Sequence, residues 1–249
     1  LYWDGVFSKD RDKPSVIQET GIMFVQTATS DARRTQDELR NLLERKYALA
    51  FAADNAGAIH WLWNINVHMD DFNEINIGAI MADGSHKLEA DVSYDVGAFM
   101  RRAGHLFKGR QLPKVSIVFP YANNFSVRDG ALAASKHATR VLGYDLGIAV
   151  QAYGEYHLDR LPADGLVLLP CARSLSCQAW EILMDRVQRG ATLLLTGPFS
   201  YDAYFRRVEG RSKALGAETK LHPTAREETS ALGGADYPAP FPGHHADGV

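Results

Sequence analysis

The stretch Lys13–Gly21, which reads Lys-Pro-Ser-Val-Ile-Gln-Glu-Thr-Gly, decides how the N-terminal part of the chain is interpreted. Residues 14–18 are typical of a short buried strand, and the polar and glycine residues that follow are typical of its end. A helix is predicted over residues 31–53, with Thr35-x-x-Glu38 as a capping box inside it. An aromatic-rich strand is predicted over Ala58–Asn64. This order of strand, helix and strand predicts a βαβ unit with parallel strands.

Two parallel strands cannot stand alone, because their backbone groups and apolar faces need neighbours. They either extend a second sheet or close a larger structure. The charged linker at residues 108–113 argues against one continuous sheet. We therefore expect residues 1–88 to form the last two βα units of an incomplete TIM barrel, whose earlier strands precede Leu1. Residues 89–112 are expected to be a connecting helix and linker.

The second half of the chain alternates between short apolar runs and helical patterns. The predicted helices are residues 127–142 and 174–189, and the predicted strands are Val115–Phe119, Leu146–Ala152, Leu166–Leu169 and Ala191–Thr196. This alternation predicts an open, flavodoxin-like parallel sheet over residues 113–216. Residues 217–249 are expected to be a polar Pro/Gly-rich tail or the start of a further domain, without assigned structure.

The composition excludes several classes of protein. The 249 residues carry 27 Lys+Arg and 30 Asp+Glu, and this balance argues against a nucleic-acid or acidic-membrane partner. The apolar runs are far shorter than a membrane span. Two cysteines rule out a disulfide scaffold and fit a cytoplasmic location. The chain begins at Leu1 and not at Met, so we expect a fragment.

No metal or cofactor is predicted. The sequence has no His-x-x-x-His or Cys-x-x-Cys pair, and His60 and His68 are poorly spaced for a metal. A flavin or dinucleotide in the second domain would bind at the carboxyl ends of the strands. The first such loop, Pro120–Ser126, lacks the glycine-rich phosphate-binding pattern. A non-catalytic or nucleotide-binding α/β module nevertheless remains the alternative function.

Four stretches together resemble the C-terminal part of a family-42-like β-galactosidase, a clan A (β/α)8 glycoside hydrolase. Residues 13–21 resemble the end of barrel strand seven, and Trp61–Asn64 resembles strand eight. Residues 72–87 are similar to the barrel exit. Residues 115–199 resemble the trimerisation domain of that family, which has a class I glutamine-amidotransferase-like fold. The resemblance implies a carbohydrate substrate and a homo-oligomer, with a trimer as one option.

The resemblance also implies roles for individual residues. Glu19 would be the catalytic nucleophile of a retaining mechanism, whereas from its position alone it is more often a solvated carboxylate at a strand end. Trp63 would stack on the sugar, with barrel packing as the alternative. Trp61, on the same strand face, is a second substrate-binding candidate, for which a place in the barrel core is favoured. Asn64 and His60 are weaker candidates for hydrogen bonds to sugar hydroxyls.

Two departures from the family pattern limit the resemblance. The acid/base glutamate of the family, in an Asn-Glu pair, would lie before Leu1. Cys171 follows a predicted strand but has no flanking glycines, so we expect it not to adopt the strained turn of an amidotransferase nucleophile. The second domain is therefore predicted to be structural.

Overall fold

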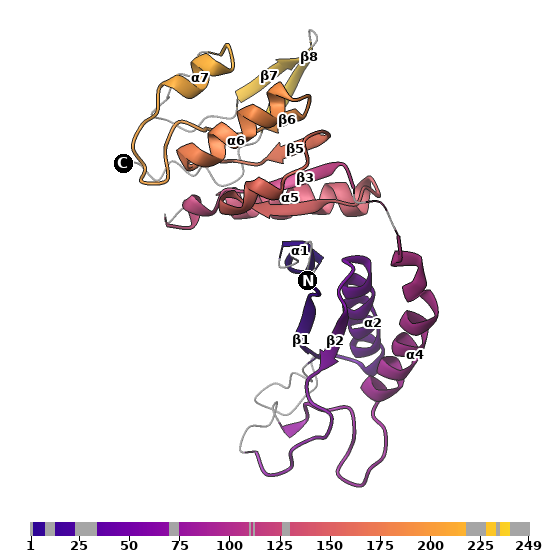
Figure 1. The fold of residues 1–249 in the computed structure, drawn as a ribbon. Helices are drawn as coiled ribbons and strands as arrows, with labels where there is room; N and C mark the ends of the chain where they lie inside the picture. The colour runs from indigo at the N-terminus through magenta and orange to yellow at the C-terminus, as the bar shows by residue number, and fades with distance from the viewer. Residues whose placement is uncertain are drawn as a thin grey trace. The chain divides into compact units, whose positions relative to one another are not determined.

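The computed structural model describes residues 2–7, 13–22, 34–69, 75–109, 111, 113–125, 130–217, 228–232 and 235–239. The chain divides into two compact units, residues 1–111 and 112–249, and each has its own parallel sheet. The first sheet does not extend the second. Of the two alternatives for residues 1–88, the chain therefore excludes the continuous sheet (Figure 1).

The first unit is a two-stranded sheet with helices on one side (Figure 1). Its elements are α1 (Tyr2–Phe7), β1 (Val16–Thr20), α2 (Gln36–Ala52), β2 (Gly57–His60), α4 (Leu88–Ala103) and η1 (Gly104–Phe107). β1 and β2 are parallel, as the βαβ pattern predicts. Helices α2 and α4 pack against each other, so the helix predicted as a connector belongs to this unit.

Helix α2 begins at the capping box that the sequence predicts. The Glu38 N–H donates to Thr35 Oγ1 at 3.2 Å, and the Thr35 N–H donates to Glu38 Oε2 at 2.7 Å. These bonds satisfy two amides that the first helical turn leaves unpaired. Leu43 and Tyr47 of α2 then form a buried cluster with Val92 of α4, on which Ala58 of β2 packs. This cluster ties both helices to one face of the sheet.

The second unit is built on a four-stranded parallel sheet in the order β4-β3-β5-β6. Its strands are β3 (Val115–Phe119), β4 (Gln151–Gly154), β5 (Leu166–Leu169) and β6 (Thr192–Leu195). Its helices are η2 (Tyr121–Phe125), α5 (Gly130–Arg140), η3 (Val141–Asp145), η4 (Glu155–Arg160), α6 (Cys177–Gln188) and α7 (Gly210–Ala214). The mixed α/β class with parallel sheets is thus confirmed.

One large hydrophobic cluster holds the second unit together. Strand residues Val118, Val167 and Leu169 pack with Trp180 and Leu183 of α6. Leu169 is fully buried, and the Trp180 ring stacks on Phe199 at 5.9 Å between centroids. The apolar side chains of these short strands are therefore buried in a hydrophobic core, whereas Val16 and Ile59 of the first sheet are exposed.

A hairpin with the same pattern of hydrogen bonds occurs in both units. In the first unit the backbone hydrogen bonds run from Met81 N to Ser85 O, from Gly84 N to Met81 O and from Lys87 N to Ala79 O. In the second unit the corresponding bonds run from Asp202 N to Arg206 O, from Phe205 N to Asp202 O and from Val208 N to Ser200 O. The fourth position of each turn has a positive φ, 83° at Gly84 and 58° at Phe205. Each hairpin also forms a parallel bridge to the segment after a sheet strand, Asn64 with Ile80 and Ser174 with Tyr201.

The predicted strand boundaries were wrong in three places. β1 is Val16–Thr20, so Glu19 lies inside the strand, and most of its residues are exposed because helices cover only one face. β2 ends at His60, before the Trp61–Leu62 peptide, which is cis. β4 starts at Gln151, because residues 146–150, between the π-turn η3 and the strand, are neither helix nor strand.

The last part of the chain contains an antiparallel hairpin where no structure was assigned. Its strands are β7 (Glu228–Leu232) and β8 (Ala235–Ala239). Among the residues that the structure describes, no helix combines the length and apolar character needed to cross a membrane.

Candidate functional site

Glu19 lies at the carboxyl end of β1, where the strand carries an irregularity. The paired positions are Ile17 with Ala58 and Thr20 with His60, so β1 has one more residue than β2 between these pairs. Such a bulge changes the direction in which side chains leave a strand, and bulges are common next to active sites. Glu19 is exposed here, whereas the neighbouring Thr20 is only 2% exposed.

The two faces of this small sheet differ sharply. Ala58 and His60 point to the helices, since Ala58 packs on the buried cluster and His60 approaches Tyr47 of α2. Side chains alternate along a strand, so Ile59 points to the opposite face, where it is 55% exposed. Thr20 pairs with His60 and is buried, which leaves Glu19 on the face of Ile59. We give the name bare face to the side opposite to α2 and α4, with Val16, Gln18, Glu19 and Ile59, together with the exposed Trp61 that follows β2.

Trp61 joins the bare face directly beside the end of β1. Its N–H donates to the carbonyl of Thr20 at 2.8 Å, and its side chain is 45% exposed. Gly21 makes this approach possible, because a Cβ on residue 21 would lie 2.7 Å from the Trp61 carbonyl oxygen. Glu19 and Trp61 are therefore held on neighbouring strand ends, and both side chains are exposed.

Trp63 and Asn64 lie elsewhere, which corrects the expectation that both tryptophans share one strand face. The backbone turns after His60, so alternation no longer relates positions 61 and 63. The Trp63 ring meets Tyr94 of α4 edge to face at 6.2 Å. Asn64 is exposed, and its backbone forms a bridge with Ile80. Residues 70–74, part of the stretch similar to a barrel exit, lie outside the described residues.

Two partly buried cations of the helix layer hold backbone near the site. Lys46 of α2 donates to the carbonyl of Gly21, and burial together with the charge of Arg34 lowers the pKa of Lys46. Lys87 donates to the carbonyls of Asn76 and Gly78 at 2.8 and 2.7 Å. Sequence analysis missed both roles. The sequence signal for Lys46 is its position on the apolar stripe of the helix predicted over residues 31–53.

The carboxyl ends of the second sheet, where doubly wound folds bind ligands, are filled by the protein itself. Glu155 is only 2% exposed, and its carboxylate accepts the N–H of Ala122 at 2.8 Å and that of Ser176 at 3.0 Å. Burial raises the pKa of Glu155, although these two hydrogen bonds act in the opposite direction. A side-chain anion thus occupies amides at the start of η2 and α6 that would otherwise face a ligand.

Cys171 adopts a backbone conformation that the sequence argued against. Its φ is 51°, in the left-handed region, and Gly197 provides the space. A Cβ on residue 197 would lie 3.2 Å from the Cys171 Sγ. The other features of a nucleophile turn are missing: α6 starts only at Cys177, and burial raises the pKa of the Cys171 thiol.

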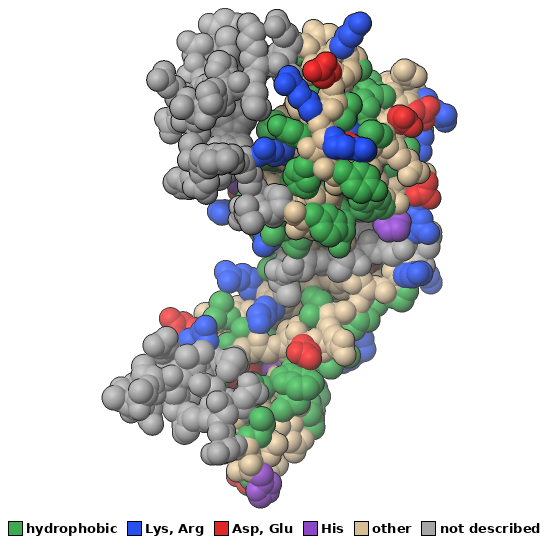
Figure 2. All heavy atoms as spheres, turned by 90° about the vertical axis from the view of Figure 1, so that its left-hand side faces the viewer, with side chains coloured by type: hydrophobic (Ala, Val, Ile, Leu, Met, Phe, Trp, Pro, Cys, Tyr) green, Lys and Arg blue, Asp and Glu red, His purple; other side chains and the backbone are tan. Residues whose placement is uncertain are grey.

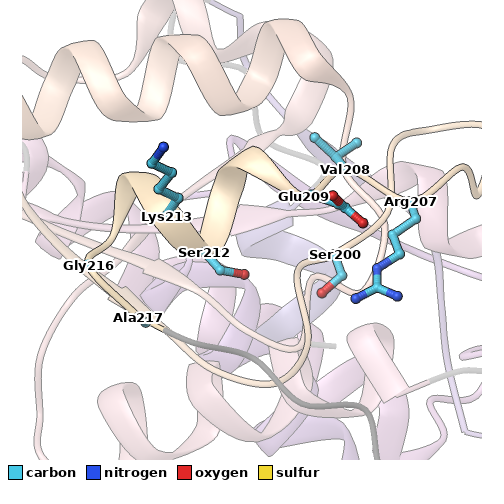
Figure 3. A pocket seen from close by; sticks show the side chains of 8 residues that line it. All are labelled: Ser200, Arg207, Val208, Glu209, Ser212, Lys213, Gly216 and Ala217. Carbon is cyan, nitrogen blue, oxygen red and sulfur yellow. The ribbon is translucent and has the colours of Figure 1, made fainter.

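A shallow pocket of about 450 Å³ lies on the second unit beside α7. Figure 3 shows Ser212 and Lys213 of α7 across from Ser200 and Arg207. Its wall is largely exposed, and it has none of the residues predicted for the site. Within the described part of the chain, no group of three or more His, Cys, Asp or Glu side chains is arranged to hold a metal ion.

Charges of both signs occur on both units on the face shown in Figure 2, with exposed hydrophobic side chains between them. In the first unit, exposed apolar side chains include Val16, Ile59 and Trp61 of the bare face.

No protein-family model matches the sequence, and no curated protein matches it. Solved structures do match. The GH42 β-galactosidase Gan42B, of G. stearothermophilus, superposes with a TM-score of 0.67 at 15% identity, over 95% of this chain and 36% of that one. The fold is similar to part of this barrel enzyme.

Two further neighbours are also glycoside hydrolases. The β-galactosidase of the haloarchaeon Halorubrum lacusprofundi gives a TM-score of 0.61 at 16% identity, over 86% of this chain and 32% of its own. The exo-β-1,4-mannosidase Op5Man5 of Opitutaceae bacterium strain TAV5 gives 0.59 at 15% identity, over 89% and 39%. This chain therefore spans about a third of the length of each enzyme that it resembles.

Proposed function

We propose that this chain forms the C-terminal part of a retaining β-glycosidase, with Glu19 as nucleophile and β-galactosides or related β-linked sugars as substrates. The observation that carries the proposal is the bare face, where Glu19 and Trp61 lie on adjacent carboxyl ends of parallel strands. Catalytic groups of (β/α)8 enzymes stand at this end of the strands. The glycosidase fold of the structural neighbours supports the same assignment.

In the proposed reaction the Glu19 carboxylate attacks the anomeric carbon while the glycosidic C–O bond breaks. A second carboxylic acid gives its proton to the leaving oxygen, and its carboxylate then takes a proton from the water that releases the sugar. The two carboxyl groups of such enzymes lie about 5 Å apart. We assign the second group to barrel strands outside this chain. The open face of Trp61 is suited to stack on the sugar ring.

The proposal explains why an apolar sheet face is left open. Val16 is 49% and Ile59 55% exposed, which is unusual for β-branched residues in a parallel sheet. If β1 and β2 are strands seven and eight of a barrel, these side chains fill its interior. The remaining strands then cover both free edges of the pair.

The second unit is proposed to be the flavodoxin-like domain of a homo-oligomer, with a structural role. Its strand order, β4-β3-β5-β6, corresponds to the first four strands of a 2-1-3-4-5 sheet. A nucleotide or flavin function is disfavoured, because Glu155 already binds the amides of Ala122 and Ser176 and would repel a phosphate.

Glu19→Gln in the complete protein tests the assignment. Turnover of an aryl β-galactoside should fall at least about 1,000-fold, because the amide cannot form the covalent intermediate, while sugar binding persists. Glu181→Gln, at an exposed position of α6, is the matched control and should retain full activity. Normal turnover by Glu19→Gln would remove Glu19 from the mechanism.

A further inference from the structure

Two consecutive residues of α2 reach the carboxyl ends of both strands of the first sheet. Lys46 Nζ donates to the carbonyl of Gly21, just after β1. The Tyr47 hydroxyl lies 3.3 Å from Nδ1 of His60, the last residue of β2, and 3.0 Å from Ser93 Oγ of α4. A single helical turn therefore contacts both strand ends from the side opposite to the bare face.

The direction of the hydrogen bonds around Tyr47 follows from proton counting. Ser93 Oγ donates its single proton to the carbonyl of Glu89 at 2.7 Å, so it accepts from the Tyr47 hydroxyl. The Tyr47 oxygen is then an acceptor for Nδ1–H of His60. Burial lowers the pKa of His60, which favours the neutral ring, and the hydrogen bond to Tyr47 then places its proton on Nδ1. His60 therefore donates to Tyr47, Tyr47 donates to Ser93, and Ser93 donates to the carbonyl of Glu89, so each donor has its own acceptor.

The groups held in this way adjoin the two residues of the site. Gly21 is the residue that must lie against the Trp61 carbonyl, and it follows Glu19 by two positions. His60 is bonded to Trp61 through the chain. Neither Lys46 nor Tyr47 belongs to the bare face, so neither is placed to touch a sugar bound there.

We propose that Lys46 and Tyr47 are positioning residues, which fix the nucleophile Glu19 relative to the stacking ring of Trp61. This inference rests on the proposed function. The geometry of a covalent step is demanding: a displacement of about 1 Å lowers the rate by about 100-fold. Sugar binding uses many contacts and tolerates such a shift, so kcat changes more than KM.

The test compares Lys46→Met, Lys46→Arg and Tyr47→Phe in the complete protein with an aryl β-galactoside as substrate. Lys46→Met and Tyr47→Phe should each lower kcat about 10-fold to 100-fold and change KM less than about threefold. Lys46→Arg keeps a cationic donor and should recover most of kcat. Arg45→Met, at the exposed neighbouring position of α2, is the control and should match the unsubstituted protein.

The outcomes separate the two proposals. If Glu19→Gln abolishes turnover but Lys46→Met and Tyr47→Phe behave like Arg45→Met, the positioning role is wrong and the proposed function stands. If kcat and KM change equally, or Lys46→Arg is as impaired as Lys46→Met, the role is also refuted. If Lys46→Met fails to fold by circular dichroism, Tyr47→Phe, which removes one oxygen atom, decides. If Glu19→Gln retains turnover, both proposals fall.

Discussion

The two units of this chain share parallel strands and a repeated hairpin, but different groups lie at the carboxyl ends of their strands. Both have parallel strands, and both repeat one hairpin, at residues 79–87 and 200–208, with matching hydrogen bonds. In the second unit Glu155 binds the amides at the strand ends, and Leu169 is sealed in a core. In the first unit Glu19 and Trp61, at the carboxyl ends of the strands, are exposed. Function is therefore expected where the framework is left unfilled.

The largest difference between the units should appear on truncating one strand residue in each. Leu169→Ala should lower the free energy of unfolding of the second unit by about 2–5 kcal/mol, because its side chain is fully buried. Ile59→Ala should change the first unit by less than about 0.5 kcal/mol in this chain alone, since Ile59 is already 55% exposed. Urea unfolding, with hydrogen exchange of peptides from each unit, measures both.

The same pair of variants sharpens the barrel proposal. In the complete protein, Ile59→Ala should become destabilising by about 2 kcal/mol, because the barrel interior then surrounds it. An equal, small effect of Ile59→Ala with and without the rest of the protein would contradict a barrel.

The free energy of unfolding of the second unit should depend on pH, because Glu155 is buried at the ends of its strands. The pKa of Glu155 is raised by burial, so the folded chain holds this proton more tightly than the unfolded chain. The contribution of Glu155 to the free energy of unfolding is therefore complete below the ordinary value of 4.5 and falls as pH rises through the raised pKa. The slope is at most about 1.4 kcal/mol per pH unit.

Glu155→Gln isolates this contribution. The difference in unfolding free energy between the unsubstituted chain and Glu155→Gln should decrease from pH 4 to pH 8, whereas Glu181→Gln should give a flat difference. Trp180, the only tryptophan of the second unit, reports the transition. A difference that increases with pH would mean that the carboxylate is stabilised by its amide partners more than it is penalised by burial.

The smallest expected effects concern the helix caps. Thr35→Ala removes a capping box from α2, and Ser176→Ala removes the hydroxyl that accepts from the Ala179 N–H at the start of α6. Each should lower the stability of its own unit by about 1 kcal/mol, and Thr35→Ser and Ser176→Thr should restore most of it. A loss that spreads to both units would show that they unfold together.

The sequence predicted a strand correctly where a local pattern of residues sets the bounds of that strand. β3 and β5 have the predicted bounds, because short apolar runs that end at Pro120 and Pro170 specify buried strands. The run Ala58–Asn64 has the same apolar character, but its backbone turns after His60, and side-chain alternation gives no warning of that. β4 was misplaced because the apolar residues 146–150 after the π-turn lie outside the strand.

The candidate site was predictable only in its strand residues. Glu19 and Trp61 follow apolar runs and are candidates from the sequence, although the sequence favours Trp63 over Trp61 as the stacking ring. The contacts of Lys46 and Tyr47 join residues 25 and 13 positions apart, and no local pattern encodes them. Cys171, in its left-handed conformation, lies against Gly197 at another strand end, and the residues next to Cys171 in the sequence do not indicate this contact.

The bare face has a consequence for how the protein is made. Freshly synthesised β1 and β2 offer unpaired backbone and apolar side chains to any other unfinished sheet, including a second nascent copy of themselves. Yield in the cell then depends on how soon the proper neighbouring strands arrive. Holdase chaperones and the timing of translation become part of the molecule's biology.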